Sequence, residues 1–260
     1  MKVALTIAGS DSSGGAGIQA DLKTFEAFGV FGTSALTVLT AQNTAGVRDI
    51  FEVSPEFVKA QIEAVLEDFD VDVIKIGMLY SAQIIHAVKE SIKDLAIPIV
   101  LDPVFISKVG SPLLQSDAVE AMRELFPYAS LITPNLYEAK ELFGYEHGDS
   151  ASLESVMACS APVLIKNHIL EMPDGVKSLD LLYMNGRKKV FVSPALASSN
   201  LHGTGCSYAS AIAANLALGE PLEQAIENAK KFIYEAIKNA PNLGKGAGPI
   251  NHKEGGLQWN

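Results

Sequence analysis

Short runs rich in β-branched residues alternate along this 260-residue chain with segments in which apolar residues recur every three or four positions. The short runs predict strands at residues 3–8, 34–39, 73–76, 97–101, 131–133 and 163–165. The periodic segments predict helices at residues 55–68, 81–95 and 222–237. Strands that are apolar along their whole length need helices over both faces. The sequence therefore predicts an α/β fold with a mostly parallel central sheet.

Two further elements are predicted outside this alternation. Residues 181–184 and 189–192 flank Asn185-Gly186, a dipeptide suited to the positive φ angles of a type I′ turn, so we expect a β-hairpin there. A short helix is expected around residues 153–158. Because no low-complexity segment, long linker or shift in composition interrupts the sequence, we expect a single domain over residues 1–260.

The charge and cysteine content disfavour several classes of protein. A formal net charge of −10 argues against non-specific binding to nucleic acid or to an anionic membrane, so a bound phosphate needs local donors and a counter-cation. Cys159 and Cys206 are too few for a disulfide framework and lack metal-ligand spacing. No apolar run reaches membrane-spanning length, and the N-terminal run is too short for a secretion signal. We therefore expect a cytoplasmic protein.

The motif His202-Gly203-Thr204-Gly205-Cys206 stands directly before a predicted helix of small residues at 207–216. The N–H groups and positive dipole end of a helix N-terminus attract anions, and glycines let the backbone approach a phosphate closely. Cys206 adds an ionisable thiol beside that anion. The motif indicates a place where a phosphoryl group is moved, although a Gly-Thr-Gly run can also serve only as a tight start for a helix.

Pocket-building residues follow the predicted strands at their carboxyl ends, where open parallel sheets bind ligands. The residues at or just beyond these ends include Gly9, Asp11, Gln42, Met78, Asp102, Asn135 and Lys166. Because the carboxyl ends of parallel strands share one edge of the sheet, we expect these residues to surround one pocket together with the loop at 203–206.

Eight motifs occur in order along nearly the whole chain. They are Leu5-Thr6-Ile7-Ala8-Gly9-Ser10-Asp11, Ser13-Gly14-Gly15-Ala16-Gly17-Ile18-Gln19-Ala20-Asp21-Leu22-Lys23-Thr24, Ala41-Gln42-Asn43-Thr44, Lys75-Ile76-Gly77-Met78-Leu79, Leu101-Asp102-Pro103-Val104, Leu131-Ile132-Thr133-Pro134-Asn135, His202-Gly203-Thr204-Gly205-Cys206 and Gly244-Lys245-Gly246-Ala247-Gly248-Pro249. Together they resemble the hydroxymethylpyrimidine/phosphomethylpyrimidine kinases of thiamine biosynthesis, within the ribokinase-like superfamily. The resemblance implies a three-layer sandwich, ATP and Mg²⁺, and a homodimer. It also implies transfer of the γ-phosphoryl group to the hydroxymethyl oxygen of an aminopyrimidine, followed by a second transfer that gives the diphosphate.

The resemblance assigns catalytic roles to the loop before the small-residue helix. Cys206 stands where sugar-kinase relatives carry an aspartate base, and a helix N-terminus is expected to lower the pKa of its thiol and favour proton transfer. The alternative is a small buried residue of which only the backbone N–H matters. Gly203, Thr204 and Gly205 would donate N–H groups to the moving phosphoryl oxygens.

Metal and nucleotide contacts are implied for five residues. Asn135 and Glu138 form an Asn-x-x-Glu motif that would organise the water around Mg²⁺, and the same spacing favours a helix capping box. Asp102 would join the Mg²⁺ site, or else cap a turn. Lys166 and Lys245 would lie beside the ATP phosphates, where the alternative is solvated lysines.

The pyrimidine end would be formed by Gly9, Asp11, Asp21, Gln42 and Met78. Gln42 offers donors and acceptors to ring nitrogens and an exocyclic amine, and Met78 offers an apolar wall. For Asp21, in the first helix, the alternative is a surface or capping carboxylate.

The chain departs from the family pattern at three places, and other functions stay open. Lys166 is followed by Asn167 and His168 where the family has two glycines and then histidine, the stretch at residues 148–161 is brief, and Leu201 replaces a threonine. Pyridoxal kinase is the nearest enzymatic alternative. A sugar kinase is disfavoured because it would need aspartate at Cys206 and a longer lid. A non-catalytic pyrimidine- or nucleotide-binding module would bind its ligand without consuming ATP.

Overall fold

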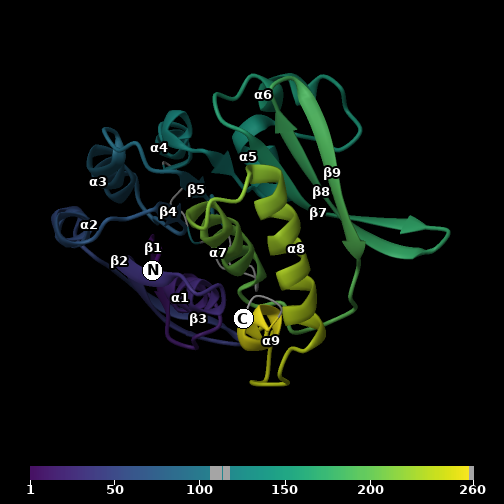
Figure 1. The fold of residues 1–260 in the computed structure, drawn as a ribbon, viewed down its shortest axis with the longest axis horizontal. Coiled ribbons are helices and arrows are strands. Elements are labelled where there is room, and N and C mark those ends of the chain that lie inside the picture. The colour runs from purple at the N-terminus through teal and green to yellow at the C-terminus, as the bar shows by residue number, and fades with distance from the viewer. Residues whose placement is uncertain (106–112, 114–117, 258–260) are drawn as a thin grey trace.

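The centre of the computed structural model, which describes residues 1–105, 113 and 118–257, is one nine-stranded sheet (Figure 1). Its order is β3-β2-β1-β4-β5-β6-β7-β8-β9. The strands are β1 (Val3–Asp11), β2 (Phe31–Asn43), β3 (Gly46–Glu52), β4 (Val73–Ile76), β5 (Ile99–Leu101), β6 (Leu131–Ile132), β7 (Val163–Met172), β8 (Gly175–Met184) and β9 (Arg187–Pro194). Strands β2, β1, β4, β5, β6 and β7 run parallel, and the chain reverses its direction of travel across the sheet at β1. Ligands bind at such a reversal.

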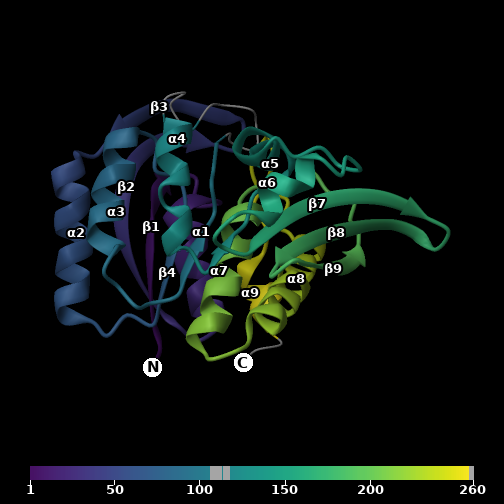
Figure 2. The same cartoon turned by 90° about the horizontal axis from the view of Figure 1, so that it is seen from above.

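Helices cover both faces of the sheet, so the predicted three-layer α/β architecture is confirmed (Figure 2). One layer holds α2 (Pro55–Asp68), α3 (Ala82–Ile92), α4 (Ala118–Arg123), α5 (Leu136–Phe143) and α6 (Ser152–Met157), with the 3₁₀ turn Phe126–Tyr128. The other holds α1 (Gly17–Ala27), α7 (Thr204–Ala217), α8 (Leu222–Lys238) and α9 (His252–Gly256). None of these helices, nor any other in the described part of the chain, is long and apolar enough to cross a membrane.

Both faces of the central strands are buried, as their apolar runs predict. Along β1, Ala4 packs against one helical layer and Leu5 against the other, and both are fully buried. The predicted helix at 55–68 has the bounds expected, and its N-cap Ser54 accepts a hydrogen bond from Phe57 N. Ser81 is the N-cap of α3 rather than its first residue.

The strands at the two sides of the sheet differ most from the prediction. Strand β3 was not expected; it pairs antiparallel with an elongated β2, and its half-exposed residues lack a continuous apolar run. The predicted hairpin is confirmed but is longer, since it comprises all of β8 and β9. Asn185 (φ 51°) and Gly186 (φ 71°) both adopt the left-handed conformation at its turn. Strand β7 continues to Met172 and forms a second hairpin with β8, which projects from the body of the molecule (Figure 1).

Candidate active site

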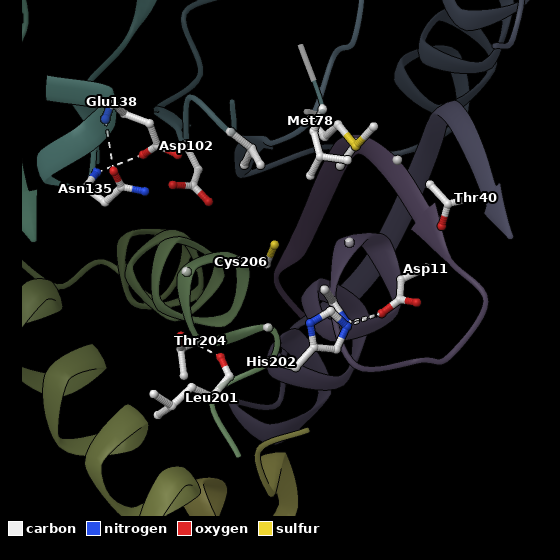
Figure 3. Close-up of a pocket in the computed structure, with 18 of the residues that line it drawn as sticks. Asp11, Thr40, Met78, Asp102, Asn135, Glu138, Leu201, His202, Thr204 and Cys206 are labelled. Atoms are coloured by element: carbon white, nitrogen blue, oxygen red, sulfur yellow. Dashed lines mark hydrogen bonds and ion pairs between the residues drawn. The ribbon is translucent and has the colours of Figure 1, made fainter. Parts of the chain in front are cut away.

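A cavity of about 320 Å³ lies at the carboxyl edge of the parallel strands. The predicted site residues that line it are Gly9, Asp11, Gln42, Met78, Asp102, Asn135, Glu138, Lys166, Gly203, Thr204, Gly205 and Cys206. Figure 3 shows Asp102, Asn135 and Glu138 on one side of Cys206, and Met78 and Asp11 on the other. The structure therefore brings together residues from both ends of the chain, as the strand-end argument predicts.

The N-terminus of α7 opens onto this cavity. Its N-cap, Gly203, has φ 83° and no side chain to cap the helix, and a Cβ there would lie 1.8 Å from Gly15 O. Only glycine fits so close an approach. The first N–H groups of a helix have no partner within the helix, so those of Gly205 and Cys206 are suited to an anion in the cavity.

Burial raises the pKa of the Cys206 thiol to about 11, and the charges of Asp21 and Asp102 act in the same direction. The positive charge of Lys75 and a hydrogen bond from Gly17 N–H oppose this shift without cancelling it. The expectation that the helix N-terminus lowers this pKa is therefore wrong, because desolvation of a thiolate outweighs the dipole. Near neutral pH the side chain of Cys206 is a protonated thiol.

A buried ion pair, Lys166 with Asp102, lines the same cavity as Cys206. Lys166 Nζ lies 2.5 Å from Asp102 Oδ1, which also accepts a hydrogen bond from Thr133 Oγ1 at 3.0 Å. Burial opposes the charge of Lys166, but the carboxylates of Asp102 and Glu138 outweigh it and raise the lysine pKa. Burial also raises the pKa of Glu138 to about 7, although the charge of Lys166 opposes that shift.

Asn135 and Glu138 form a capping box at the start of α5. Asn135 Oδ1 accepts from Glu138 N at 2.9 Å, and Glu138 Oε2 accepts from Asn135 N at 2.8 Å. The helix-capping alternative is thus confirmed, and the same two side chains still line the cavity.

The donor set fits Mg²⁺ shared with phosphate. The described residues contain no group of three or more His, Cys, Asp or Glu that could hold a metal ion. Mg²⁺ in phosphoryl-transfer sites is usually bound by one or two carboxylates, with phosphate and water oxygens completing the shell. Asp102 and Glu138 provide two such carboxylates, so a Mg²⁺ ion here would need a bound phosphate to complete its coordination.

Asp11 organises the glycine-rich loop that follows β1. Its Oδ1 accepts hydrogen bonds from Ser13, and its Oδ2 accepts from Gly15 N, from Ala16 N and from His202 Nε2 at 2.7 Å. Burial disfavours its charge, but the bonds from His202 and Ser13 hold its pKa well below the ordinary value. Asp11 lines the cavity, but both of its carboxylate oxygens already accept hydrogen bonds from the loop and from His202. Its observed role is therefore to hold the loop in place. His202, which directly precedes the Gly-Thr-Gly run, was not predicted as a site residue.

Gln42 and Met78 form the other wall. Gln42 Oε1 accepts from Thr40 Oγ1 at 3.1 Å, and its Nε2 lies 3.5 Å from His202 Nε2. Met78 packs with Val38 and Leu113. This wall thus combines an amide with an apolar surface. Further lining residues that were not predicted as site residues include Thr40, Lys75, Val104, Leu113, Tyr137 and Leu201.

Two predicted residues lie outside the cavity. Asp21 is fully buried below it, where its carboxylate accepts from Lys75 Nζ (2.9 Å), Thr6 Oγ1 (2.7 Å) and Ser210 Oγ (2.7 Å). Asp21 does not line the cavity, so this geometry gives no support to its predicted contact with substrate, which stays a prediction. Lys245 is also absent from the lining: its side chain is exposed and its N–H donates to Thr44 Oγ1 at 3.1 Å, so its contact with the ATP phosphates stays a prediction.

A second cavity, of about 260 Å³, adjoins the first. Residues common to both linings are Lys166, Asn167, Leu201, Thr204 and Gly205. Beyond them the second cavity is walled by β8, β9 and α8, through residues that include Asp180, Pro194, Leu196, Ile233, Tyr234 and Ile237. The start of α7 therefore stands between two spaces, each large enough for part of a small molecule.

Comparison with known proteins agrees with this arrangement. Residues 11–251 match the family described as phosphomethylpyrimidine kinase. The chain is 45% identical over 260 residues to the hydroxymethylpyrimidine/phosphomethylpyrimidine kinase of Haemophilus influenzae, with 97% of each chain covered. Among solved structures it is similar to an ADP complex of Bacillus subtilis pyridoxal kinase (37% identity, TM-score 0.87, all of both chains). It is also similar to the phosphomethylpyrimidine kinase of Clostridium difficile (40% identity, TM-score 0.77, 91% of this chain and 100% of the other). A match over nearly the whole length, in sequence and in fold, places this chain in the phosphomethylpyrimidine kinase family.

Proposed function

We propose that this protein transfers the γ-phosphoryl group of ATP to the hydroxymethyl oxygen of 4-amino-5-hydroxymethyl-2-methylpyrimidine, and then phosphorylates the monophosphate to the diphosphate. The observation that carries this proposal is the N-terminus of α7 between two adjoining cavities. The relative from Haemophilus influenzae carries both kinase activities in its name, and the Bacillus subtilis structure contains ADP.

The pyrimidine would occupy the first cavity, with Gln42 at its ring nitrogens and amine and Met78 against its face. ATP would occupy the second, with its γ-phosphate at the α7 N-terminus. The hydroxymethyl oxygen then forms a bond to the γ-phosphorus while the bond from phosphorus to the β–γ bridging oxygen breaks. The hydroxyl proton passes to solvent, and ADP leaves. Such a reaction depends mainly on alignment and charge stabilisation.

The chain's own residues supply that stabilisation. The N–H groups at Gly205 and Cys206 would donate to the transferred phosphoryl oxygens, and Lys166 would meet the phosphate charge where the cavities join. Asp102 and Glu138 would hold Mg²⁺, which neutralises phosphate charge when it is bound. The protonated thiol of Cys206 favours a role in placement over one as proton acceptor.

A product assay tests the proposal directly. Purified protein is given Mg-ATP with hydroxymethylpyrimidine, its monophosphate, pyridoxal or ribose in parallel, and the products are resolved by mass. Sequential appearance of the pyrimidine monophosphate and diphosphate is expected. Phosphorylation of pyridoxal alone would reject the substrate assignment, and binding of the pyrimidine without ATP consumption would reject the enzyme.

Pyridoxal kinase is the second candidate, because the structural match to the Bacillus subtilis pyridoxal kinase covers all of both chains. Pyridoxal also presents a hydroxymethyl group on a six-membered nitrogen ring, so the same cavity can accept either shape. The ratio of kcat/KM for the two substrates decides between them.

Three expectations from the sequence stay predictions of this proposal: a homodimer, a single cooperative domain and a cytoplasmic location. Light scattering of the purified chain tests the first. Calorimetry tests the second, for which one unfolding transition is expected. Cell fractionation tests the third.

A further inference from the structure

Strand β7 carries a bulge where it passes the two cavities. Its register with β8 shifts between Ile165 and His168, so that Asp180 of β8 lies opposite two residues, Lys166 and Asn167. Both residues of the bulge line both cavities. Bulges next to active sites re-aim side chains, and this one contains the lysine that pairs with the Asp102 carboxylate.

The backbone of this bulge is held in a conformation that needs support. Asn167 has φ 70°, the left-handed region that a non-glycine residue adopts only at a cost in free energy. Its N–H lies in the interrupted part of the ladder and donates instead to Asp180 Oδ1 at 3.0 Å. This hydrogen bond is half-buried, and it supplies an acceptor for an N–H that the interrupted ladder leaves without one, so the Asp180 side chain takes the place of the strand pairing that the bulge removes.

The other oxygen of Asp180 connects to the helices behind the sheet. Asp180 Oδ2 accepts hydrogen bonds from Tyr208 Oη at 2.8 Å and from Lys230 Nζ at 2.6 Å. Tyr208 lies one turn into α7, after Thr204, and Lys230 lies on α8. A single carboxylate thus joins the bulge of β7 to α7, the helix whose N-terminus lines the two cavities.

The side chains of Asp180, Tyr208 and Lys230 are buried and balanced in charge, while Asn167 itself is exposed. Asp180, Tyr208 and Lys230 are 2%, 6% and 8% exposed. Burial and the neighbouring Asp180 charge raise the pKa of Tyr208 well above its ordinary value, so the phenol stays a hydrogen-bond donor. Lys230 provides the counter-charge. Satisfied buried networks of this kind hold their elements in one arrangement.

We propose that Asp180 is a positioning residue for phosphoryl transfer, which through the Asn167 backbone sets the place of the Lys166 ammonium relative to the N-terminus of α7. This inference rests on the proposed function, in which Lys166 meets the phosphates of ATP. Asp180 also lines the second cavity, so its test must separate positioning from direct contact with the nucleotide.

The test compares Asp180→Ala with the double variant Asp180→Ala/Asn167→Gly. Asp180→Ala is expected to lower kcat/KM for ATP by about tenfold or more, while the KM for the pyrimidine changes less than about twofold. Glycine adopts the left-handed conformation without strain, so the double variant should regain about threefold or more of that loss. A direct contact between Asp180 and the nucleotide would not be restored by glycine at position 167.

Asp72 offers a matched control. Its carboxylate also accepts a backbone N–H, from Val3 at 2.8 Å, and a lysine, Lys2 at 2.7 Å, but it lines neither cavity. Asp72→Ala should leave both KM values unchanged. A double variant no better than Asp180→Ala overturns the inference, as does an equal loss toward both substrates that follows the folded fraction seen by circular dichroism.

If Asp180→Ala does not fold, Tyr208→Phe takes its place, because it removes one donor to Asp180 and keeps the ring. A rise of about threefold or more in the KM for ATP alone is expected, and an unchanged KM for ATP overturns the inference. If the wild type binds ATP without turnover, the proposed function fails. In that case the Kd for ATP is measured for the same variants, and the fold-changes given above for ATP are applied to the Kd to accept or reject the role of Asp180.

Discussion

Lys166 Nζ lies 2.5 Å from Asp102 Oδ1, although the residues are 64 positions apart and strand β6 runs between their strands. Asp102 directly follows β5, and Lys166 belongs to the bulge of β7. Both are buried, and Glu138 adds a second carboxylate that favours the charged lysine. A phosphate that arrives at the junction of the cavities therefore meets an ammonium group that is already formed and held in place.

Removal of this cation should affect activity and stability together. Lys166→Met is expected to lower kcat/KM for ATP by about 100-fold or more, because the phosphates lose their counter-charge. It also leaves Asp102 buried without a partner, and breaking a buried pair from one side costs about 3 to 5 kcal/mol. Kinetics at varied ATP and thermal melts measure the two effects.

The double variant Lys166→Met/Asp102→Asn is the control for this experiment. It removes both charges, so it should melt closer to the wild type than Lys166→Met does while remaining inactive. Wild-type kcat/KM for ATP in Lys166→Met would contradict the role assigned to the lysine.

Glu138 should make stability depend on pH. Burial first, and then the Asp102 charge, raise its pKa from 4.5 to about 7. Between these two pH values the folded state binds more protons than the unfolded state, so the free energy of unfolding falls as pH rises. Glu138→Gln can keep the capping hydrogen bond and removes the titration. The melting temperature of Glu138→Gln relative to that of the wild type should therefore increase from pH 5 to pH 8. If the difference between the two melting temperatures is constant over this range, the raised pKa of Glu138 is contradicted.

The same substitution tests the metal role. Glu138→Gln removes one of two carboxylates in the cavity, so the Mg²⁺ concentration for half-maximal rate should rise about fivefold or more. Glu141→Gln is the matched control, because Glu141 is exposed on the same helix and lines neither cavity. An equal Mg²⁺ requirement in both variants would place the ion elsewhere.

Variants of Cys206 distinguish a role in placing the substrate from a role in accepting its proton. Because its pKa is about 11, we expect Cys206→Ser to keep about a tenth or more of wild-type kcat at pH 7.5, and Cys206→Ala to lose less than about 100-fold. Removal of a general base usually costs about 10²- to 10⁴-fold. A loss in that range for both variants, with native circular dichroism spectra, would restore the general-base hypothesis.

Gln42 should act on the pyrimidine alone. Gln42→Ala removes an amide from the cavity wall and is expected to raise the KM for hydroxymethylpyrimidine by about tenfold, with the KM for ATP unchanged. Gln224→Ala serves as the control, since Gln224 bonds Asn228 on α8 and lines neither cavity. Equal changes in both KM values for Gln42→Ala would show a general disturbance of the site.

Part of the site follows from local pattern and part does not. Gly203 could be placed at a helix N-terminus from the sequence, because glycines before a run of small residues signal that geometry locally. Asp21 could not be placed correctly, because its partners Lys75 and Ser210 are 54 and 189 positions away. The role of Asp180 could not be predicted from the sequence, because a lone aspartate in a strand becomes informative only once the bulge opposite it is known.

The sequence by itself determined the α/β alternation, the parallel strands with their carboxyl ends at one edge, the Asn185-Gly186 turn and the motif that begins α7. These features depend on residue periodicity and on backbone preferences that act over a few positions. Only the tertiary structure decided that Lys245 is exposed, that Asp11 is bound by His202, that Cys206 is a protonated thiol and that Lys166 sits in a bulge supported by Asp180. Those outcomes depend on burial and on long-range partners, which arise when distant strands and helices pack together.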